Sequence, residues 1–136
     1  MKRFSQFALS SVVTPEQLLD RVSEVVGVAA RQQLWLMFLD ERDVQLPEII
    51  PIDVPARPEE RARDSFETFV SQVVEATACW SVIAVLERPG ARALSADDRA
   101  WFRLIRDAVG NAGVNLRGPL LSHSTGVGLI EPEDVS

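Results

Sequence analysis

The chain has very few of the residues that build metal centres and covalent crosslinks. Among its 136 residues, Cys79 is the only cysteine and His123 the only histidine. These counts exclude an intrachain disulfide and a cysteine-rich zinc site. No apolar run approaches the ~20 residues that a membrane-spanning helix needs. Residues 4–13 are interrupted by polar side chains and show no small-residue cleavage site, so we expect no secretory signal and a cytoplasmic protein.

Positive charge is also scarce. The 14 Lys and Arg residues are outnumbered by 20 Asp and Glu residues, which gives a formal charge of −6. A negative chain is not drawn as a whole to nucleic acid or to anionic membranes. Arg99, Arg103 and Arg106 recur at helical spacing, but a solvated helix face accounts for such a stripe. We therefore expect no nucleic-acid partner and no membrane partner.

The pattern of apolar residues predicts three helices and five strands. Helical spacing occurs in three stretches, at residues 15–29, 59–77 and 95–112. Strand patterns occur in five stretches, at residues 34–39, 44–52, 80–86, 114–122 and 127–130. Thr14 and Ser95 stand where helix caps are expected, and Pro47 and Pro51 favour an edge position for the second strand.

The predicted order is α-β-β-α-β-α-β-β, which favours a single α/β domain. A hairpin followed by two helical crossovers implies a mixed β-sheet with helices on both faces. This domain is expected over residues 14–130, after an N-terminal extension at 1–13 and before an acidic, frayed C-terminal tail at 131–136. Trp35, Trp80 and Trp101 fall on apolar faces and are expected in the core.

One loop carries a resemblance to a known family. The sequence VLERPG at residues 85–90 leads into SADD at residues 95–98. With the element order, this segment resembles the JAB/MPN metalloprotease fold, especially its bacterial RadC branch, over about residues 33–130. In that family a strand ends in His-x-His-Pro, and Ser followed three positions later by Asp opens the next helix. The resemblance implies a zinc site made of the two His and the Asp, with a Glu on the earlier hairpin handling the proton of the attacking water.

Only part of this pattern is carried over. Pro89, Ser95 and Asp98 match, although the interval from Pro89 to Ser95 is slightly shorter than in the family. Glu48, on the second predicted strand, falls where the catalytic Glu is expected. The same Ser-to-Asp spacing is also a common helix cap, so the motif is weakly specific.

The metal-binding positions do not match. Leu86 and Arg88 stand where the two His residues are expected, so one carboxylate and no imidazole remain, which cannot form a three-ligand zinc centre. We expect no metal, no cofactor and no metal-dependent peptidase activity. The Arg88 guanidinium could replace the metal's charge by bridging Asp98 and Glu48. The alternative is that Arg88 is a solvated turn residue.

Two other enzyme classes lack their defining residues or spacings in this sequence. The cytidine deaminase fold has a similar element order, but its His-x-Glu and Pro-Cys-x-x-Cys signatures are absent. Cys79 and His123 could form a nucleophile–base pair, but no spacing brings them within hydrogen-bonding reach. Cys79 lies among apolar residues, where a free cysteine normally behaves as a small hydrophobe.

The leading hypothesis is a non-catalytic binding or interaction module on a JAB/MPN-like scaffold. Its partner would be another protein, or a second copy met through an exposed strand edge or helix. This inference is by analogy, because function resides in sites rather than in folds. The alternative is a metal-independent enzyme or small-molecule binder that uses the degenerate cleft around Glu48, Arg88 and Asp98.

Overall fold

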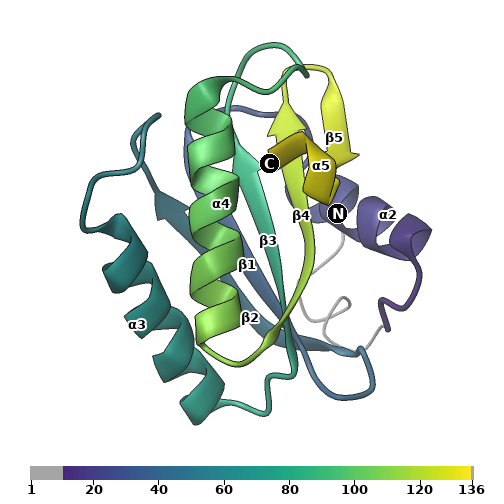
Figure 1. The fold of residues 1–136 in the computed structure, drawn as a ribbon. Coiled ribbons are helices and arrows are strands. Elements are labelled where there is room, and N and C mark those ends of the chain that lie inside the picture. Colours follow the sequence, from purple (N-terminus) through teal and green to yellow (C-terminus); the bar gives the residue numbers. More distant parts are fainter. Residues whose placement is uncertain (1–10, 136) are drawn as a thin grey trace.

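The computed structural model describes residues 11–135, which form one α/β domain around a five-stranded mixed sheet (Figure 1). The strands are β1 (Gln33–Leu39), β2 (Gln45–Asp53), β3 (Ser81–Glu87), β4 (Asn115–His123) and β5 (Gly126–Leu129). The helices of this part are α2 (Pro15–Val25), α3 (Ala62–Ala76), α4 (Ala96–Asn111) and the short α5 (Pro132–Val135). The predicted order of eight elements and the mixed α/β class are confirmed.

The sheet has the order β2-β1-β3-β4-β5. Only β3 and β4 are parallel, and α4 connects them, whereas the other neighbours pair antiparallel. A parallel pair needs such a crossover because its second strand must start from the same end of the sheet as its first. The carboxyl ends of β3 and β4 therefore lie side by side, next to the loop that enters α4.

Each face of the sheet has its own apolar core. On β3, Val82, Ala84 and Leu86 pack into the core under α3 and α4, whereas Ile83 and Val85 pack into the core under α2. This alternation follows from the two-residue period of a strand. Every residue of β3 is buried, so this strand lies in the interior of the domain, as expected for a strand covered on both faces.

Capping explains where two of the helices begin. The Thr14 hydroxyl accepts from the Gln17 backbone N–H, and Ser95 makes the same bond with Asp98. Helix α2 ends at Val25, earlier than the predicted residue 29, because Gly27 adopts a positive φ of 71° and turns the chain away. The segment that follows, residues 27–32, crosses the carboxyl ends of β3 and β4, where the Ala29 N–H donates to the His123 carbonyl.

Two expectations about exposure are wrong. The tail is not frayed at residues 132–135, because α5 buries Val135 against the α4 side of the core and Arg103 donates to its carbonyl. Trp80 is 57% exposed, because it immediately precedes β3 and lies outside the layer that the helices cover. Trp101 is buried as expected.

The N-terminal boundary is only partly visible. Ser11 forms a β-bridge with Val44 and Val12 is fully buried, so the domain's packing already includes these two residues. The rest of the predicted N-terminal extension, residues 1–10, lies outside the described residues. No helix between residues 11 and 135 combines the length and the apolar character required to cross a bilayer.

Candidate functional site

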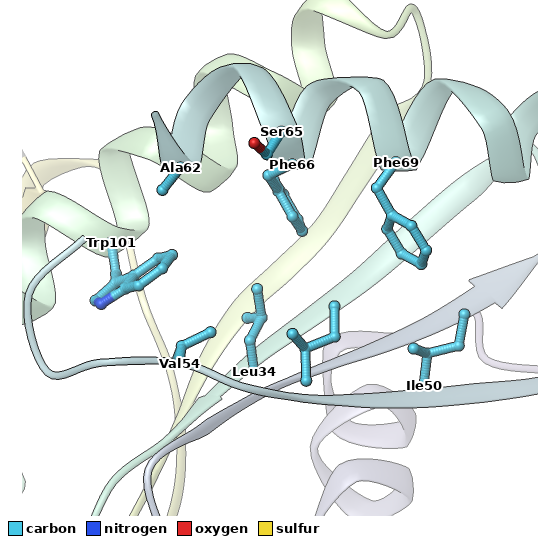
Figure 2. A pocket seen from close by; sticks show the side chains of 9 residues that line it. Leu34, Ile50, Val54, Ala62, Ser65, Phe66, Phe69 and Trp101 are labelled. Atoms are coloured by element: carbon cyan, nitrogen blue, oxygen red, sulfur yellow. The ribbon is translucent and has the colours of Figure 1, made fainter. Parts of the chain in front are cut away.

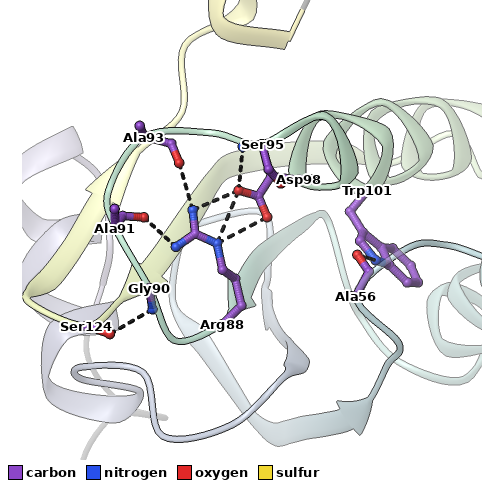
Figure 3. A network of polar contacts seen from close by, with 9 residues as sticks. All are labelled: Ala56, Arg88, Gly90, Ala91, Ala93, Ser95, Asp98, Trp101 and Ser124. Carbon is purple, nitrogen blue, oxygen red and sulfur yellow. Dashed lines mark hydrogen bonds and ion pairs between the residues drawn. The ribbon is translucent and has the colours of Figure 1, made fainter.

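The Arg88 guanidinium is the centre of the polar cluster at the carboxyl end of β3 (Figure 3). Strand β3 ends at Glu87, so Arg88 is the first residue of the loop into α4. Its Nε lies 3.1 and 3.2 Å from the two carboxylate oxygens of Asp98, and its Nη2 lies 2.7 Å from Oδ2. Nη1 also donates to the Ala91 carbonyl, and Nη2 to the Ala93 carbonyl at 3.0 Å. Arg88 is thus a buried crosslink between the strand, its loop and the next helix.

The loop after Arg88 is also tied to β4. The Arg88 N–H donates to the Ser122 carbonyl at 3.0 Å. Gly90 and Ser124 exchange two bonds, from the Gly90 N–H to the Ser124 hydroxyl at 2.7 Å and from the Ser124 N–H to the Gly90 carbonyl at 3.0 Å. Hydrogen bonds within the protein therefore hold this loop on both of its sides.

Asp98 serves as a structural carboxylate in this cluster. Its Oδ2 accepts from the Ser95 N–H at 2.9 Å, while its own N–H donates to the Ser95 hydroxyl at 3.0 Å, which completes the capping box of α4. Burial alone would raise the pKa of Asp98. The hydrogen bonds and positive charge of Arg88, with the bonds from Ser95, instead hold this pKa below its ordinary value. Asp98 is therefore an ionised carboxylate whose two oxygens both accept from Arg88.

Glu48 lies apart from the other three residues of the expected cleft. Asp53 of β2 and Glu87 of β3 lie level with each other, because both pair with Gln33 of β1. Glu48 comes five residues before this level and Arg88 one residue after it, a separation of about 20 Å along the strands at ~3.3 Å per residue. The structure therefore brings together Arg88, Ser95 and Asp98 and leaves Glu48 exposed near the other end of β2.

His123 and Cys79 also lie at opposite ends of the sheet. His123 ends β4 next to the Arg88 loop, whereas Cys79 precedes β3 at its amino end. Burial, with the positive charges of Arg88 and Arg92, lowers the pKa of His123, and its Nδ1 lies 3.3 Å from the Thr125 N–H as an acceptor. Burial raises the pKa of Cys79 to about 11, so its thiol is protonated at neutral pH. These two residues form no nucleophile–base pair.

Glu87 is a buried carboxylate that the sequence patterns did not single out. It is 3% exposed and accepts four hydrogen bonds, which span 2.6 to 3.2 Å and come from Ala30 N, Arg31 N, Gln33 Nε2 and Trp35 Nε1. Burial alone would raise the pKa of Glu87, but these four donors lower it below the ordinary value. Glu87 thus fastens residues 30–31 to the sheet. The available signal was an acidic residue directly after the apolar residues 82–86.

Outside this cluster, the described residues form an apolar groove between α3 and the β1–β2 part of the sheet (Figure 2). Its volume is about 390 Å³. Phe66 and Phe69 point from α3 toward Leu34 and Ile50 on the opposite wall. The groove is lined by Leu34, Ile50, Ile52, Val54, Ala62, Ser65, Phe66, Phe69 and Trp101. Sequence patterns assigned such residues to the core. The apolar periodicity of a helix or strand is the same whether that face packs against the next layer or lines a groove beside it.

The residues present do not fit the zinc site of the family that the sequence resembles. Leu86 supplies no donor atom, and the guanidinium of Arg88 carries positive charge into the place where a cation would lie. Asp98, the one matching ligand, is engaged by that guanidinium. Across residues 11–135, no three His, Cys, Asp or Glu side chains gather in a metal-binding arrangement.

Comparisons with known proteins add no assignment. The sequence matches no protein-family model, and it has no significant match among the curated proteins.

Proposed function

We propose that this chain is a non-catalytic binding module on a JAB/MPN-like scaffold, in which Arg88 has taken the place of the metal. The observation that carries the proposal is the hydrogen bonding of Arg88. Its guanidinium engages both oxygens of Asp98 and two loop carbonyls, which belong to Ala91 and Ala93. A catalytic group needs donors or lone pairs directed at a substrate, and this cluster directs them at its own loop.

The position of the cluster supports the scaffold part of the proposal. In open α/β sheets, sites form at the carboxyl ends of parallel strands, and Arg88 occupies this position on β3 next to the end of β4. A cation held there by a carboxylate would be replaced in charge by a guanidinium paired with the same carboxylate. The separation of Glu48 from Arg88 weakens the alternative of a metal-independent site in the same cleft.

The scaffold part is tested by restoring the metal ligands with the double substitution Leu86→His and Arg88→His. Residue 88 follows residue 86 by two positions along the direction of β3, so both side chains point to the face of the sheet that α4 covers. The two imidazoles would therefore join Asp98 in a three-ligand site. We expect this variant to bind one Zn²⁺ per chain and to gain thermal stability from it, as measured by calorimetry and thermal unfolding. The parent chain and the variant that also carries Asp98→Asn should gain none.

Because Leu86 is fully buried, the double variant is to be measured with and without zinc. Recovery of the folded state on zinc addition supports the proposal as fully as stabilisation does. A folded variant that zinc leaves unchanged, or a variant that stays unfolded at saturating zinc, overturns the JAB/MPN-like placement of this loop. Turnover by the parent chain that Arg88→Met abolishes would overturn the non-catalytic role.

A further inference from the structure

The α3–β2 groove is a cavity of the size that small ligands occupy. Its volume of about 390 Å³ falls within the roughly 300–1,000 Å³ of known ligand pockets. The groove is open to solvent, and a concave, mostly apolar recess of this size is the usual form of a small-molecule binding site.

The arrangement of the helices explains why the groove is open. Helix α3 packs chiefly against α4, and Glu67 accepts a hydrogen bond of 2.8 Å from Asn111 across this helix pair. Trp101 of α4 is fixed by its indole N–H, which donates to the Pro55 and Ala56 carbonyls at 3.0 and 3.1 Å. The first contact holds α3 against α4, and the second fixes α4 to the loop between β2 and α3. Phe66 and Val70 of α3 pack into the core, whereas Phe69 is only partly buried and faces the groove.

The lining limits the chemistry of the occupant. Eight of the nine lining residues are apolar, and the ninth, Ser65, carries an uncharged hydroxyl. A charged ligand would lose its hydration there and meet no opposite charge, which is strongly unfavourable. The ring faces of Phe66, Phe69 and Trp101 favour contact with a flat apolar body (Figure 2).

A second copy of the chain or a peptide fits the groove less well. A strand could pair with the exposed edge of β2, but Pro47 and Pro51 lack the N–H groups that a continuous ladder needs. Prolines on an edge strand are a recognised defence against such pairing. The recess in the surface, rather than the strand edge beside it, is the feature available for binding.

We infer that the groove between α3 and β2 binds an uncharged, flat, largely apolar small molecule with at most one polar group, which the Ser65 hydroxyl meets. This inference rests on the proposed binding function and names its ligand class and location.

The test is a titration with N-phenyl-1-naphthylamine, an uncharged fluorescent probe with aromatic rings. We expect saturable binding of one probe per chain, with a rise in probe fluorescence. The anionic analogue 8-anilinonaphthalene-1-sulfonate should bind at least tenfold more weakly. Ser65→Phe, which fills the groove from an exposed helical position, should weaken binding of the uncharged probe at least tenfold.

Thr68→Phe is the matched control, because Thr68 is an exposed residue of α3 that does not line the groove. It adds the same ring to the same helix and should leave binding unchanged. Ala62→Phe provides a second filling variant if Ser65→Phe proves unstable by urea unfolding. Equal binding by the filling variants and the control, or binding that does not saturate, overturns the inference. So does sedimentation showing a dimer that Ser65→Phe dissociates, since the groove would then be a subunit interface.

The two proposals can fail separately. Probe binding in the groove together with no zinc binding by the Leu86→His and Arg88→His variant retains the ligand site and rejects the scaffold. Zinc binding by that variant together with no specific probe binding retains the scaffold and rejects the ligand site.

Discussion

The polar cluster around Arg88 and the apolar groove between α3 and β2 differ in how far their side chains are engaged within the protein. The cluster contains the residues that suggest chemistry, yet its hydrogen bonds go to Asp98, to the loop and to β4. The groove contains almost no polar groups, yet it keeps an unfilled volume of about 390 Å³. The charged residues of this cluster therefore hold the fold together, whereas the apolar recess is the place where we propose that a ligand binds.

The largest effect is expected for Arg88→Met. Removing one partner of a buried ion pair leaves Asp98 as an uncompensated charge, and the free energy of unfolding should fall by about 3–5 kcal/mol in urea titrations. Arg106→Met is the matched control, because the Arg106–Asp107 pair is 54% and 40% exposed and should contribute less than about 1 kcal/mol. Similar losses in the two variants would show that the Arg88 cluster does not hold the loop.

A somewhat smaller loss is expected for Glu87→Gln. The amide nitrogen of Gln would face donors that now point to a carboxylate oxygen, at a cost of about 3 kcal/mol for the bonds lost. Hydrogen exchange gives the local readout, since the Ala30 and Arg31 amides should exchange faster in the variant. Glu48→Gln changes an exposed carboxylate and should alter neither quantity. Unchanged protection at residues 30 and 31 would contradict the assigned role of Glu87.

Phe69→Ala should cost less than a comparable change in the packed core. Phe69 lines the open groove, so its loss removes contacts on one side only, and we expect a loss of about 1 kcal/mol. Phe102 is fully buried in the same core cluster, and Phe102→Ala should cost about 3–5 kcal/mol. Urea unfolding of both variants measures the difference. Equal losses would mean that α3 closes onto the sheet in solution and that the groove is absent.

The smallest effect expected is the pH dependence that Glu87 and Asp98 confer. Both have a pKa lowered in the folded state, from ordinary values of 4.5 and 3.8, so folding favours their ionised forms. Their contribution is complete above the unfolded-state pKa values and is lost as the pH falls through the folded-state pKa values. Thermal midpoints should decline below about pH 4.5. Glu87→Gln should flatten this decline, and Glu48→Gln should not; equal slopes would refute the assignment.

Local sequence signals predicted much of the fold. Three of these signals depend only on neighbours along the chain, and each is present in the structure. They are the helix caps at Thr14 and Ser95, the apolar period of α4, and the apolar residues 82–86 of β3. The pairing of Arg88 with Asp98 also came within reach, because only ten residues and one helix start separate them. The path of residues 27–32 over the ends of β3 and β4 did not, since it depends on strands that are distant in sequence.

The sequence by itself determined the order of the elements and the absence of imidazole at residues 86 and 88, because both depend on residue types and short spacings. Only the tertiary structure decided that Glu48 is about 20 Å along the sheet from Arg88, since strand register sets that separation. It also decided that α3 packs against α4 and leaves a groove beside β2. The apolar face of α3 shows in the sequence that its burial is favourable. The distance between this face and the sheet depends on all the contacts that hold the helix, and many of these join residues that are distant in sequence.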